Sequence, residues 1–325
     1  MAISVIVSNF NGAKYLLRLL ETLKAQEGVT MEIIIVDRHS KDASAEILRQ
    51  HPDVKVVQEP PETGLVSGYA AGVPHARYEN LFFCNEDMWF EPDCLRLLEA
   101  QLDLSKRIAA VDPWQWTYDG TTWIHGLTQF RPVRWNIGGP FSNALLDFTA
   151  RGEPGQLTPF GCAGAVLINA NVYREIGGWD RGFFLDQEDI DLFIRFWQAG
   201  WKCVIEPRAK VYHAVGASNT QAIKRGALQV SKRRYLSARS SSLIIALKYF
   251  SIRRVLLAIL SALLLTIAHA LKLRWKQTCW DVLSLVEFLR RSPAALNYRL
   301  SHRALRQNRP AENFTIDPAF TAQAE

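Results

Sequence analysis

The segment "FLDQEDIDLFIRFWQAGW", residues 184–201, opens with a dense group of carboxylates and continues as an apolar run with helical spacing. The carboxylates are Asp186, Glu188, Asp189 and Asp191. Asp191 and Arg195 are four residues apart, so an ordinary surface ion pair accounts for Asp191. Asp189 shares its helix face with Phe193 and Phe196, where a carboxylate is costly unless it is paired or lies at the rim of a cleft. Because partial desolvation raises a carboxyl pKa, we predict that Asp189 is a general base.

A second polar group follows an apolar run in "FFCNEDMWFEP", residues 82–92. Asn85 and Asp87 are alternate residues at a strand end, so their side chains point the same way. Such oxygen ligands suit a hard divalent cation, which can in turn hold a diphosphate, although a simple turn explains the same residues. His213 ends the strand in "AKVYHAVG". It is either a structural histidine or, if it faces Asp87, a further ligand that suits Mn²⁺ better than Mg²⁺.

A third candidate is Asp37, which ends the apolar run in "IIIVDRHSKD". A carboxylate at this sheet edge can accept hydrogen bonds from a base or a ribose. A turn or helix-capping aspartate fits the pattern equally simply. The next residue, Arg38, either meets a diphosphate or is a solvated surface residue.

Strands and helices must alternate to position these residues. The expected strands are residues 2–8, 31–42, 54–60 and 78–93, and the expected helices are 11–26, 43–51 and 67–77. This alternation predicts a mostly parallel α/β sheet flanked by helices. Ligands bind such sheets at the carboxyl ends of the strands, where Asn9, Asp37 and Asn85–Asp87 lie.

The middle of the chain has less regular patterning. Residues 112–158 are rich in Trp, Gly and Pro, and they predict either a loop-rich insertion or an irregular extension of the sheet. Residues 159–180 then read as a Gly-rich loop, a strand, a helix and a Gly-Gly turn. Residues 202–216 read as a pair of strands ending at His213.

Charge separates the chain into two parts. Residues 221–325 carry 18 Lys and Arg against 5 Asp and Glu, whereas the preceding 220 residues carry 20 against 27. The basic part therefore favours an anionic partner, either a membrane surface or a nucleic acid. The hydrophobic fraction of 48% is sufficient for a large core. The five cysteines form no CxxC pair, and the N-terminus lacks a signal-peptide pattern, so we expect a reducing compartment.

The basic part contains an apolar run without charged residues, Val255–Leu271. These 17 residues span about 26 Å as a helix, slightly less than a bilayer core requires. Basic residues flank the run on both sides. A transmembrane helix and an in-plane or re-entrant helix therefore both remain open.

Seven motifs in a fixed order carry a resemblance to a known family. They are "VIVSNFNG", "EIIIVDRHSKD", "ETGLVSGYAAG", "FFCNEDMWFEP", "GCAGAVLI", "EIGGWDRGFFLDQEDIDL" and "VYHAVGAS", within residues 3–218. In this order they resemble the family 2 glycosyltransferases of GT-A fold, and within that family the rhamnosyltransferase-like branch. Glu86 stands where many relatives of that family have Pro.

The resemblance implies roles for individual residues. The donor-binding set is Ser8, Asn9, Asp37, Arg38, Gly64, Asn85, Asp87, Gly161 and Gly164. Asp37 contacts the nucleotide base, and Asp87 with His213 holds a divalent cation, Mn²⁺ or Mg²⁺. Trp179 and Asp180 match the turn on the acceptor side. Glu188 and Asp189 match the catalytic segment, with Asp189 as the base.

The resemblance also implies a domain organisation and a function. Residues 1–220 form the GT-A catalytic domain, with the nucleotide-sugar part at about 1–111 and the acceptor part at about 112–220. Residues 221–325 form a basic, helical, membrane-proximal appendage. The expected reaction moves a sugar, with rhamnose as the candidate, with inversion from a nucleotide-diphosphate sugar to a lipid-linked or growing surface polysaccharide. The expected location is the cytoplasmic face of the bacterial inner membrane, peripheral or monotopic.

Two alternatives belong to other classes of protein. One is a catalytically degenerate nucleotide-sugar binding protein with a scaffolding role. The retained Asp87, Asp189 and His213 argue against it. The other is a nucleic-acid binder that uses the basic tail. The tail shows no interleaved aromatic stacking pattern and no known nucleic-acid motif, and its apolar run fits lipid better, so we expect no nucleic-acid partner.

Overall fold

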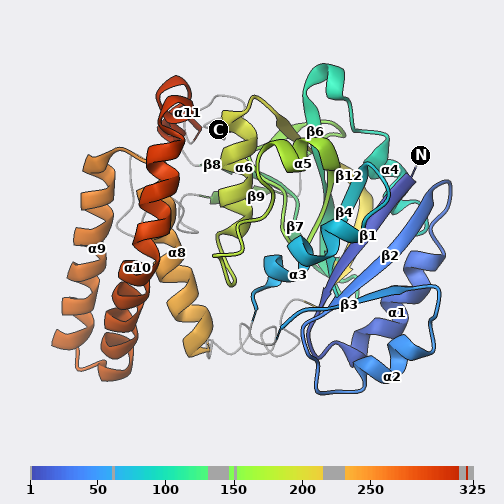
Figure 1. Ribbon diagram of the computed structural model, residues 1–325, viewed down its shortest axis with the longest axis horizontal. Helices are drawn as coiled ribbons and strands as arrows, with labels where there is room; N and C mark the ends of the chain where they lie inside the picture. The colour runs from blue at the N-terminus through green and yellow to red at the C-terminus, as the bar shows by residue number, and fades with distance from the viewer. Residues whose placement is uncertain are drawn as a thin grey trace.

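The computed structural model describes residues 2–60, 63–130, 146–149, 152–214, 231–314 and 320. A mixed β-sheet with helices on both faces stands beside a group of long C-terminal helices (Figure 1). The sheet runs in the order β10-β12-β6-β11-β4-β1-β2-β3, with β5 on β12 and β7 on β6. A separate pair is formed by β8 and β9.

The strands β1–β12 are, in order, Ala2–Asn9, Thr30–Asp37, Lys55–Gln58, Asn80–Asn85, Met88–Phe90, Ile108–Thr117, Trp123–His125, Leu127–Phe130, Leu146–Thr149, Leu157–Thr158, Ala165–Asn169 and Lys202–His213. The helices α1–α6 are Ala13–Lys24, Ser44–Arg49, Leu65–Gly72, Cys94–Glu99, Ala170–Glu175 and Glu188–Gln198. The helices α8–α12 are Lys232–Tyr249, Ile252–Leu271, Trp275–Ser301, Arg303–Asn308 and Ala311–Phe314. Short 3₁₀ turns occupy Val73–His75 and Leu104–Lys106.

The four strands expected from the N-terminal sequence are confirmed, and β4, β1, β2 and β3 are parallel neighbours. Their β-branched side chains alternate between two cores because successive residues of a strand face opposite sides of a sheet. Val5 and Val7 of β1 pack with α1 and α4, whereas Ile6 packs with α3 and α6. The pairing places Asn9 beside Asp37 and Ser8 beside Asn85 at one sheet edge.

The second half of the sheet mixes strand directions. β11 runs antiparallel to both β4 and β6, and β12 runs parallel to β6. The expected strand pair at 202–216 is wrong, because Lys202–His213 is one strand whose register shifts between Glu206 and Lys210. Of the two interpretations of residues 112–158, the described part is an irregular extension of the sheet, built from β6, β7 and β10 with β8 and β9 beside it.

The C-terminal helices pack against the part of the chain that contains the sheet. Buried residues of α8 and α10, among them Ile245 and Phe288, belong to the same core as Phe193 of α6. Asp281 of α10 is buried and connects three helices, since its carboxylate accepts from Tyr235 of α8 at 2.6 Å and contacts His269 of α9 at 2.6 Å. The domain boundary near residue 220 lies outside the described residues and stays a prediction.

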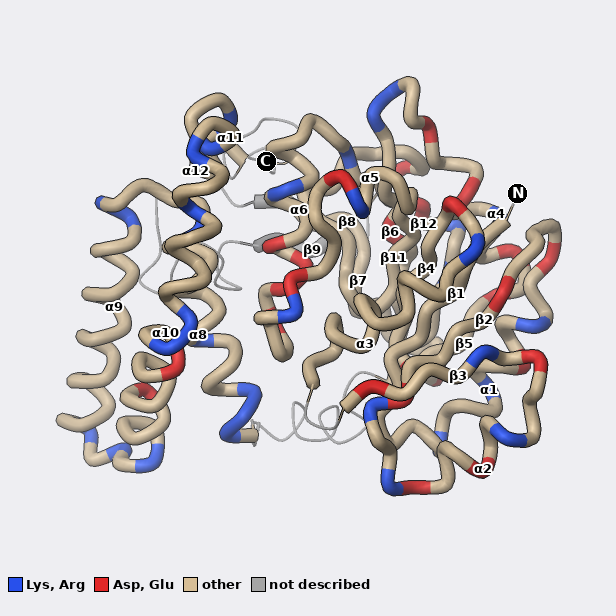
Figure 2. The backbone as a smooth tube through the Cα atoms, viewed as in Figure 1, with Lys and Arg blue, Asp and Glu red and all other residues tan. Residues whose placement is uncertain are grey.

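Helix α9 covers the apolar run noted in the sequence. Its 20 residues have a mean hydropathy of 2.1 over an 18-residue window, of which 11% is buried. By length and composition alone, it is the one helix in the described ranges that could cross a membrane. Figure 2 shows Lys and Arg residues at both of its ends.

Candidate active site

The predicted base lies at the first turn of α6, after two residues with left-handed backbone. Asp186 and Gln187 have φ angles of 68° and 74°. This conformation is uncommon for residues other than glycine, and consecutive instances mark a constrained turn. Arg234 of α8 holds Asp186 in an ion pair of 3.0 Å. The turn ends at Gln187, so Glu188 and Asp189 are the first two residues of α6.

A cleft of about 290 Å³ brings the predicted catalytic and donor residues together. Its lining includes Asn85, Gly164, Glu188, Asp189 and His213. These residues come from the ends of β4 and β12, from the loop before β11 and from α6, segments far apart in the sequence. The cleft also contains His125 and Arg234, to which the sequence assigned no role.

Burial changes the acid–base properties of the Glu188–Asp189 pair. Desolvation raises the pKa of Glu188 well above its ordinary value, and the charge of Asp189 raises it further. Desolvation also raises the pKa of Asp189, to about 6. Asp189 keeps one hydrogen bond, from the backbone N–H of Ile190 at 2.8 Å. The pKa of Glu188 is thus raised further than that of Asp189, so Asp189 is the carboxyl of the pair that ionises more readily, as a general base requires. Its role as the base stays a prediction.

His125 is a functional candidate that the sequence analysis missed. It ends β7, and its Nε2 lies 2.8 Å from Oδ2 of the fully buried Asp112. Burial alone would lower the pKa of His125, but the charges of Asp112 and Asp189 raise it overall. Asp112 also accepts a hydrogen bond from the backbone of Cys162 in the Gly-rich loop. An imidazolium in this position stabilises the charged form of Asp189. The sequence around His125 has no periodic pattern that could have placed it in a cleft.

Asp87 and His213 lie face to face, as the metal prediction requires. Asp87 Oδ1 is 3.1 Å from His213 Nε2, and Gln115 Oε1 is 3.2 Å from His213 Nδ1. Asn85 Nδ2 also lies 3.4 Å from His213 Nε2, so the three side chains meet at one point. A carboxylate and an imidazole at this separation can act as ligands of one divalent cation, and the pair suits Mn²⁺. No cluster of three His, Cys, Asp or Glu side chains occurs in the described ranges, so the remaining ligands of a cation would be Asn85 and substrate oxygens.

Tyr69 holds Asn85 in position. The Tyr69 hydroxyl lies 2.7 Å from Asn85 Oδ1 and 2.9 Å from the carbonyl of Ala163. Between Asn85 and Asp87, burial and the charge of Asp87 raise the pKa of Glu86 to about 7. Its Oε1 accepts from the backbone N–H of Phe10 at 3.3 Å. The sequence marked Glu86 only by its place between two predicted ligands and by its position where many relatives have Pro.

The remaining donor residues lie at the carboxyl edge of β1 and β2. Asp37 is satisfied within its own turn, since its Oδ1 accepts from Asn9 at 2.7 Å and from Ser40 at 2.5 Å. Ser8 Oγ, Asn9 Oδ1 and Arg38 Nε are buried without a hydrogen-bond partner in the described structure. Buried polar atoms without partners are rare, and these three fit a polar ligand at this edge. The turn accounts for Asp37 by itself, so its contact with a base stays a prediction.

Two of the predicted glycines allow close packing outside the cleft. A Cβ on Gly64 would lie 2.4 Å from the carbonyl oxygen of Phe184, and one on Gly161 would lie 2.8 Å from Val166. Gly164 does line the cleft, where its carbonyl accepts from the N–H of Asn85 at 2.9 Å.

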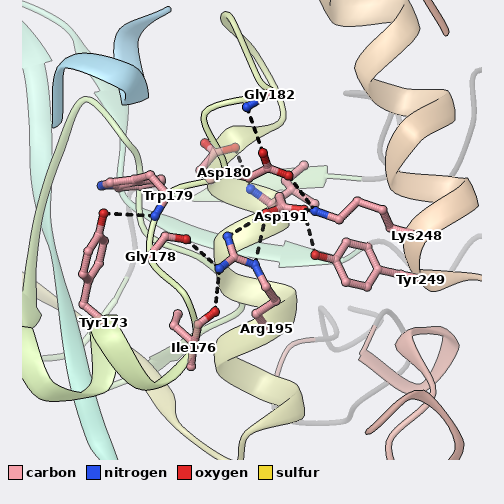
Figure 3. A network of polar contacts seen from close by, with 12 residues as sticks. Tyr173, Ile176, Gly178, Trp179, Asp180, Gly182, Asp191, Arg195, Lys248 and Tyr249 are labelled. Carbon is pink, nitrogen blue, oxygen red and sulfur yellow. Dashed lines mark hydrogen bonds and ion pairs between the residues drawn. The ribbon is translucent and has the colours of Figure 1, made fainter. Parts of the chain in front are cut away.

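The predicted acceptor residues, Trp179 and Asp180, are not among the described residues that line the cleft; Figure 3 shows both beside the network of Asp191. Trp179 is buried in the core against Tyr69 and Phe83, with ring centroids at 5.9 and 5.5 Å. Asp180 accepts from the N–H of Gly182 at 2.8 Å and pairs with Lys248 of α8 at 2.9 Å. A direct contact of either residue with an acceptor stays a prediction.

The interpretation of Asp191 as a surface ion pair is wrong, although its pairing with Arg195 is confirmed. Asp191 is fully buried, and its Oδ2 lies 2.6 Å from Arg195 Nη2. Its Oδ1 contacts Lys248 and accepts from the hydroxyl of Tyr249 at 2.7 Å (Figure 3). Burial alone would raise the pKa of Asp191, but Lys248 and Arg195 lower it to about 2. The network joins α6 to α8, a connection that the local sequence could not show.

Parallel strands β4-β1-β2-β3, helices on both faces and a cleft at the strand ends define a GT-A fold. A family model described as "Glycosyl transferase family 2" matches residues 4–177. The chain belongs to this family, as the resemblance in the sequence indicated.

Individual relatives differ in how much of the chain they match. "N-acetylgalactosaminyltransferase 6" of Drosophila melanogaster is 27% identical over 65% of this chain, which spans only 34% of that protein. "N-acetylglucosaminyl-diphospho-decaprenol L-rhamnosyltransferase" of Mycobacterium tuberculosis is 22% identical over 64% of this chain and 75% of its own length. The mannosyltransferase PcManGT from Pyrobaculum calidifontis, solved with GDP-Man and Mn²⁺, has a TM-score of 0.54 and 15% identity over 88% of this chain and 86% of its own. At that identity the likeness supports the fold alone.

Proposed function

We propose that the chain is an inverting glycosyltransferase that uses a nucleotide-diphosphate sugar. The observation that carries this proposal is the single cleft in which Asn85 and His213 face Glu188 and Asp189. A site for a diphosphate and a carboxylate with a pKa of about 6 are the two parts that direct displacement at an anomeric carbon requires. The family membership of the chain supports the same reaction.

In the proposed reaction an acceptor hydroxyl oxygen forms a bond to the anomeric carbon while the bond from that carbon to the diphosphate oxygen breaks. The hydroxyl proton goes to Asp189, and the nucleoside diphosphate leaves with the bond electrons. His125 stabilises the carboxylate form of Asp189 until the proton arrives. Asp87 and His213 would hold the divalent cation, which neutralises charge on the diphosphate when bound.

For the substrates, we favour rhamnose as the sugar and a lipid-linked or growing surface polysaccharide as the acceptor. The name of the mycobacterial relative combines L-rhamnosyl transfer with a diphospho-decaprenol acceptor. The basic C-terminal helices, with their apolar α9, suit an acceptor that is anchored in a membrane.

We further propose that α9 lies on the cytoplasmic face of the bacterial inner membrane, as a peripheral or monotopic element. Val255 and Ala258 are buried against the neighbouring helices, whereas Leu256, Leu260 and Leu263 are exposed. A helix that exposes leucines on one side, packs its other side on protein and has basic ends is suited to the membrane–water interface. The charged network of Asp281 on the neighbouring α10 disfavours a bundle that crosses the bilayer.

The double variant Leu256→Glu, Leu263→Glu is expected to weaken binding to anionic vesicles by at least about tenfold, because it places two charges on the apolar face. Both side chains are exposed, 60% and 44%, so the fold should tolerate the changes. Co-sedimentation with vesicles measures the effect. Leu104→Glu, at an equally exposed leucine of the catalytic part, is the matched control. Unchanged sedimentation of the double variant would count against the membrane proposal.

Binding of nucleoside diphosphates tests the donor proposal directly. Calorimetry with UDP, dTDP and GDP, each with and without Mn²⁺, is expected to show Mn²⁺-dependent binding of one nucleotide. Asp87→Ala should abolish the Mn²⁺-dependent part, because it removes the carboxylate that faces His213 at 3.1 Å. Asp93→Ala, on an exposed ion pair beyond β5, is the control and should bind normally. If wild-type protein binds no nucleotide, the degenerate scaffolding member becomes the better account.

A further inference from the structure

A second pocket, of about 400 Å³, lies between the catalytic part of the chain and the C-terminal helices. Four segments line it: residues 63–67 at the start of α3, residues 181–184, and the facing sides of α8 and of α10. Its charged lining consists of Arg181, Arg233, Arg290 and Arg291, with Glu287 as the one carboxylate among the described lining residues. We call these four arginines and the space between them the arginine pocket.

Arg291 is the most enclosed of the four arginines. Its Nη1 donates to the hydroxyls of Ser240 and Ser241, at 3.0 and 3.2 Å, and its guanidinium lies 5.2 Å from the ring centroid of Phe183. These partners are neutral, and desolvation lowers the pKa of Arg291. Removing a guanidinium from water without an anion costs free energy, so the site is suited to an anionic ligand.

The other charges leave the pocket positive overall. Arg290 makes two hydrogen bonds to Glu287, at 2.9 and 2.7 Å, and Arg181 pairs with Glu59. Arg233 lies over the ring of Phe184, 3.6 Å from its centroid. Guanidinium groups held beside one another by aromatic rings and hydroxyls are well suited to phosphate oxygens.

The arginine pocket and the catalytic cleft share one wall. Gly64 and Phe184 line the pocket, whereas the next residues, Leu65 and Leu185, line the cleft. The N–H of Leu65 donates to the carbonyl of Phe184 at 3.0 Å, which closes this wall. Adjacent residues of α8 divide in the same way, since Arg233 lines the pocket and Arg234 the cleft. A ligand in the pocket therefore lies next to the segment that carries Asp189.

Exposed apolar side chains neighbour the pocket residues along α10. On α10, Val286 is 54% exposed and directly precedes the pocket residue Glu287. Leu289 is 65% exposed and directly precedes the pocket residue Arg290. The neighbouring helix α9, which packs against α8 and α10 (Figure 1), carries further exposed leucines. A ligand with a phosphate group and an apolar chain would match both features.

We propose that the arginine pocket binds the phosphate or diphosphate group of the acceptor, and that the apolar chain of this acceptor lies on the exposed side chains of α9 and α10. The inference rests on the proposed transferase function and adds the site that holds the acceptor. The diphosphate of the donor has a separate place, because Asn85, Asp87 and His213 lie at the catalytic cleft.

Calorimetry on the full chain tests the proposal with three ligands: farnesyl diphosphate, farnesol and inorganic pyrophosphate. EDTA is present to remove divalent cations, so that no ligand binds through a cation at Asp87 and His213. Farnesyl diphosphate should bind more tightly than either of the other two. Arg291→Gln and Arg233→Gln should each weaken its binding by about tenfold, as expected for loss of a charge-assisted contact. Glu287→Gln should strengthen it, because it removes the carboxylate that competes for Arg290. Arg303→Gln, at an exposed arginine of α11, is the control.

The outcomes separate this inference from the function on which it rests. Nucleoside diphosphate binding with Mn²⁺ should be unchanged in the Arg291 and Arg233 variants, and an equal loss there would assign the pocket to the donor and overturn the proposal. Pyrophosphate binding as tight as farnesyl diphosphate binding would overturn the lipid-linked acceptor. Should Arg291→Gln fail to fold, the exposed Arg233 provides the same test. Absence of nucleotide binding with intact farnesyl diphosphate binding would reject the transferase function alone.

Discussion

Asp189→Asn is expected to lower kcat by about a thousandfold, within the range for loss of a general base. The amide keeps the size of the side chain but cannot accept the hydroxyl proton. Nucleotide binding should be retained, because Asp87 and His213 are untouched. Initial rates with a saturating donor and acceptor measure the effect. Glu188→Gln should lower kcat far less, since burial and the charge of Asp189 raise the pKa of Glu188 and disfavour its charged form. If the Glu188 variant loses more activity, the two roles are reversed.

The pH dependence provides a second check on the same assignment. A base with a pKa of about 6 is protonated below that pH, so kcat should fall as the pH decreases through 6 and should level off above 7. His125→Asn removes the positive charge that favours the carboxylate form of Asp189. The midpoint of the profile should therefore move to higher pH, by up to about one unit. The matched variant His75→Asn, outside the cleft, should leave the midpoint in place.

Asp191→Ala is expected to lower the free energy of unfolding by about 3–5 kcal/mol. Lys248 is 2% and Arg195 7% exposed, so the variant leaves two buried cations without their shared carboxylate. Urea unfolding followed by tryptophan fluorescence measures the change. Asp53→Ala, which breaks the exposed pair with Lys24, should have little effect. The double variant Asp191→Leu, Lys248→Met should recover part of the stability, because it removes charges from both sides of the buried pair.

The sign of the pH effect on stability follows from the lowered pKa of Asp191. A carboxyl with a pKa near 2 in the folded chain and about 4 when unfolded binds its proton more weakly in the folded state. Its contribution is complete above about pH 4 and is lost as the pH falls toward 2. The difference between wild type and Asp191→Ala should therefore shrink over that interval. A constant difference would show that Asp191 acts through packing rather than through charge.

The sequence by itself determined the N-terminal sheet and much of the cleft. Runs such as Val5–Val7 and Ile33–Val36 form buried strands through their own β-branched side chains. In a parallel sheet the carboxyl ends of such strands meet at one edge, so the order of the strands alone brings Asn9, Asp37 and Asn85 together. Asp189 was recognisable because a carboxylate on an apolar helix face requires a special environment.

Tertiary structure alone decided the parts that depend on contacts between distant segments. His125 reaches the cleft from a strand without periodic pattern, and Asp191 is buried because Lys248, 57 residues later, supplies the opposite charge. The residues next to Trp179 in the sequence do not show whether its side chain binds an acceptor or packs on Tyr69 in the core. The arginine pocket forms only where α8 and α10 meet the catalytic part of the chain. Local propensity sets strands and helices, whereas burial and charge pairing are properties of the assembled fold.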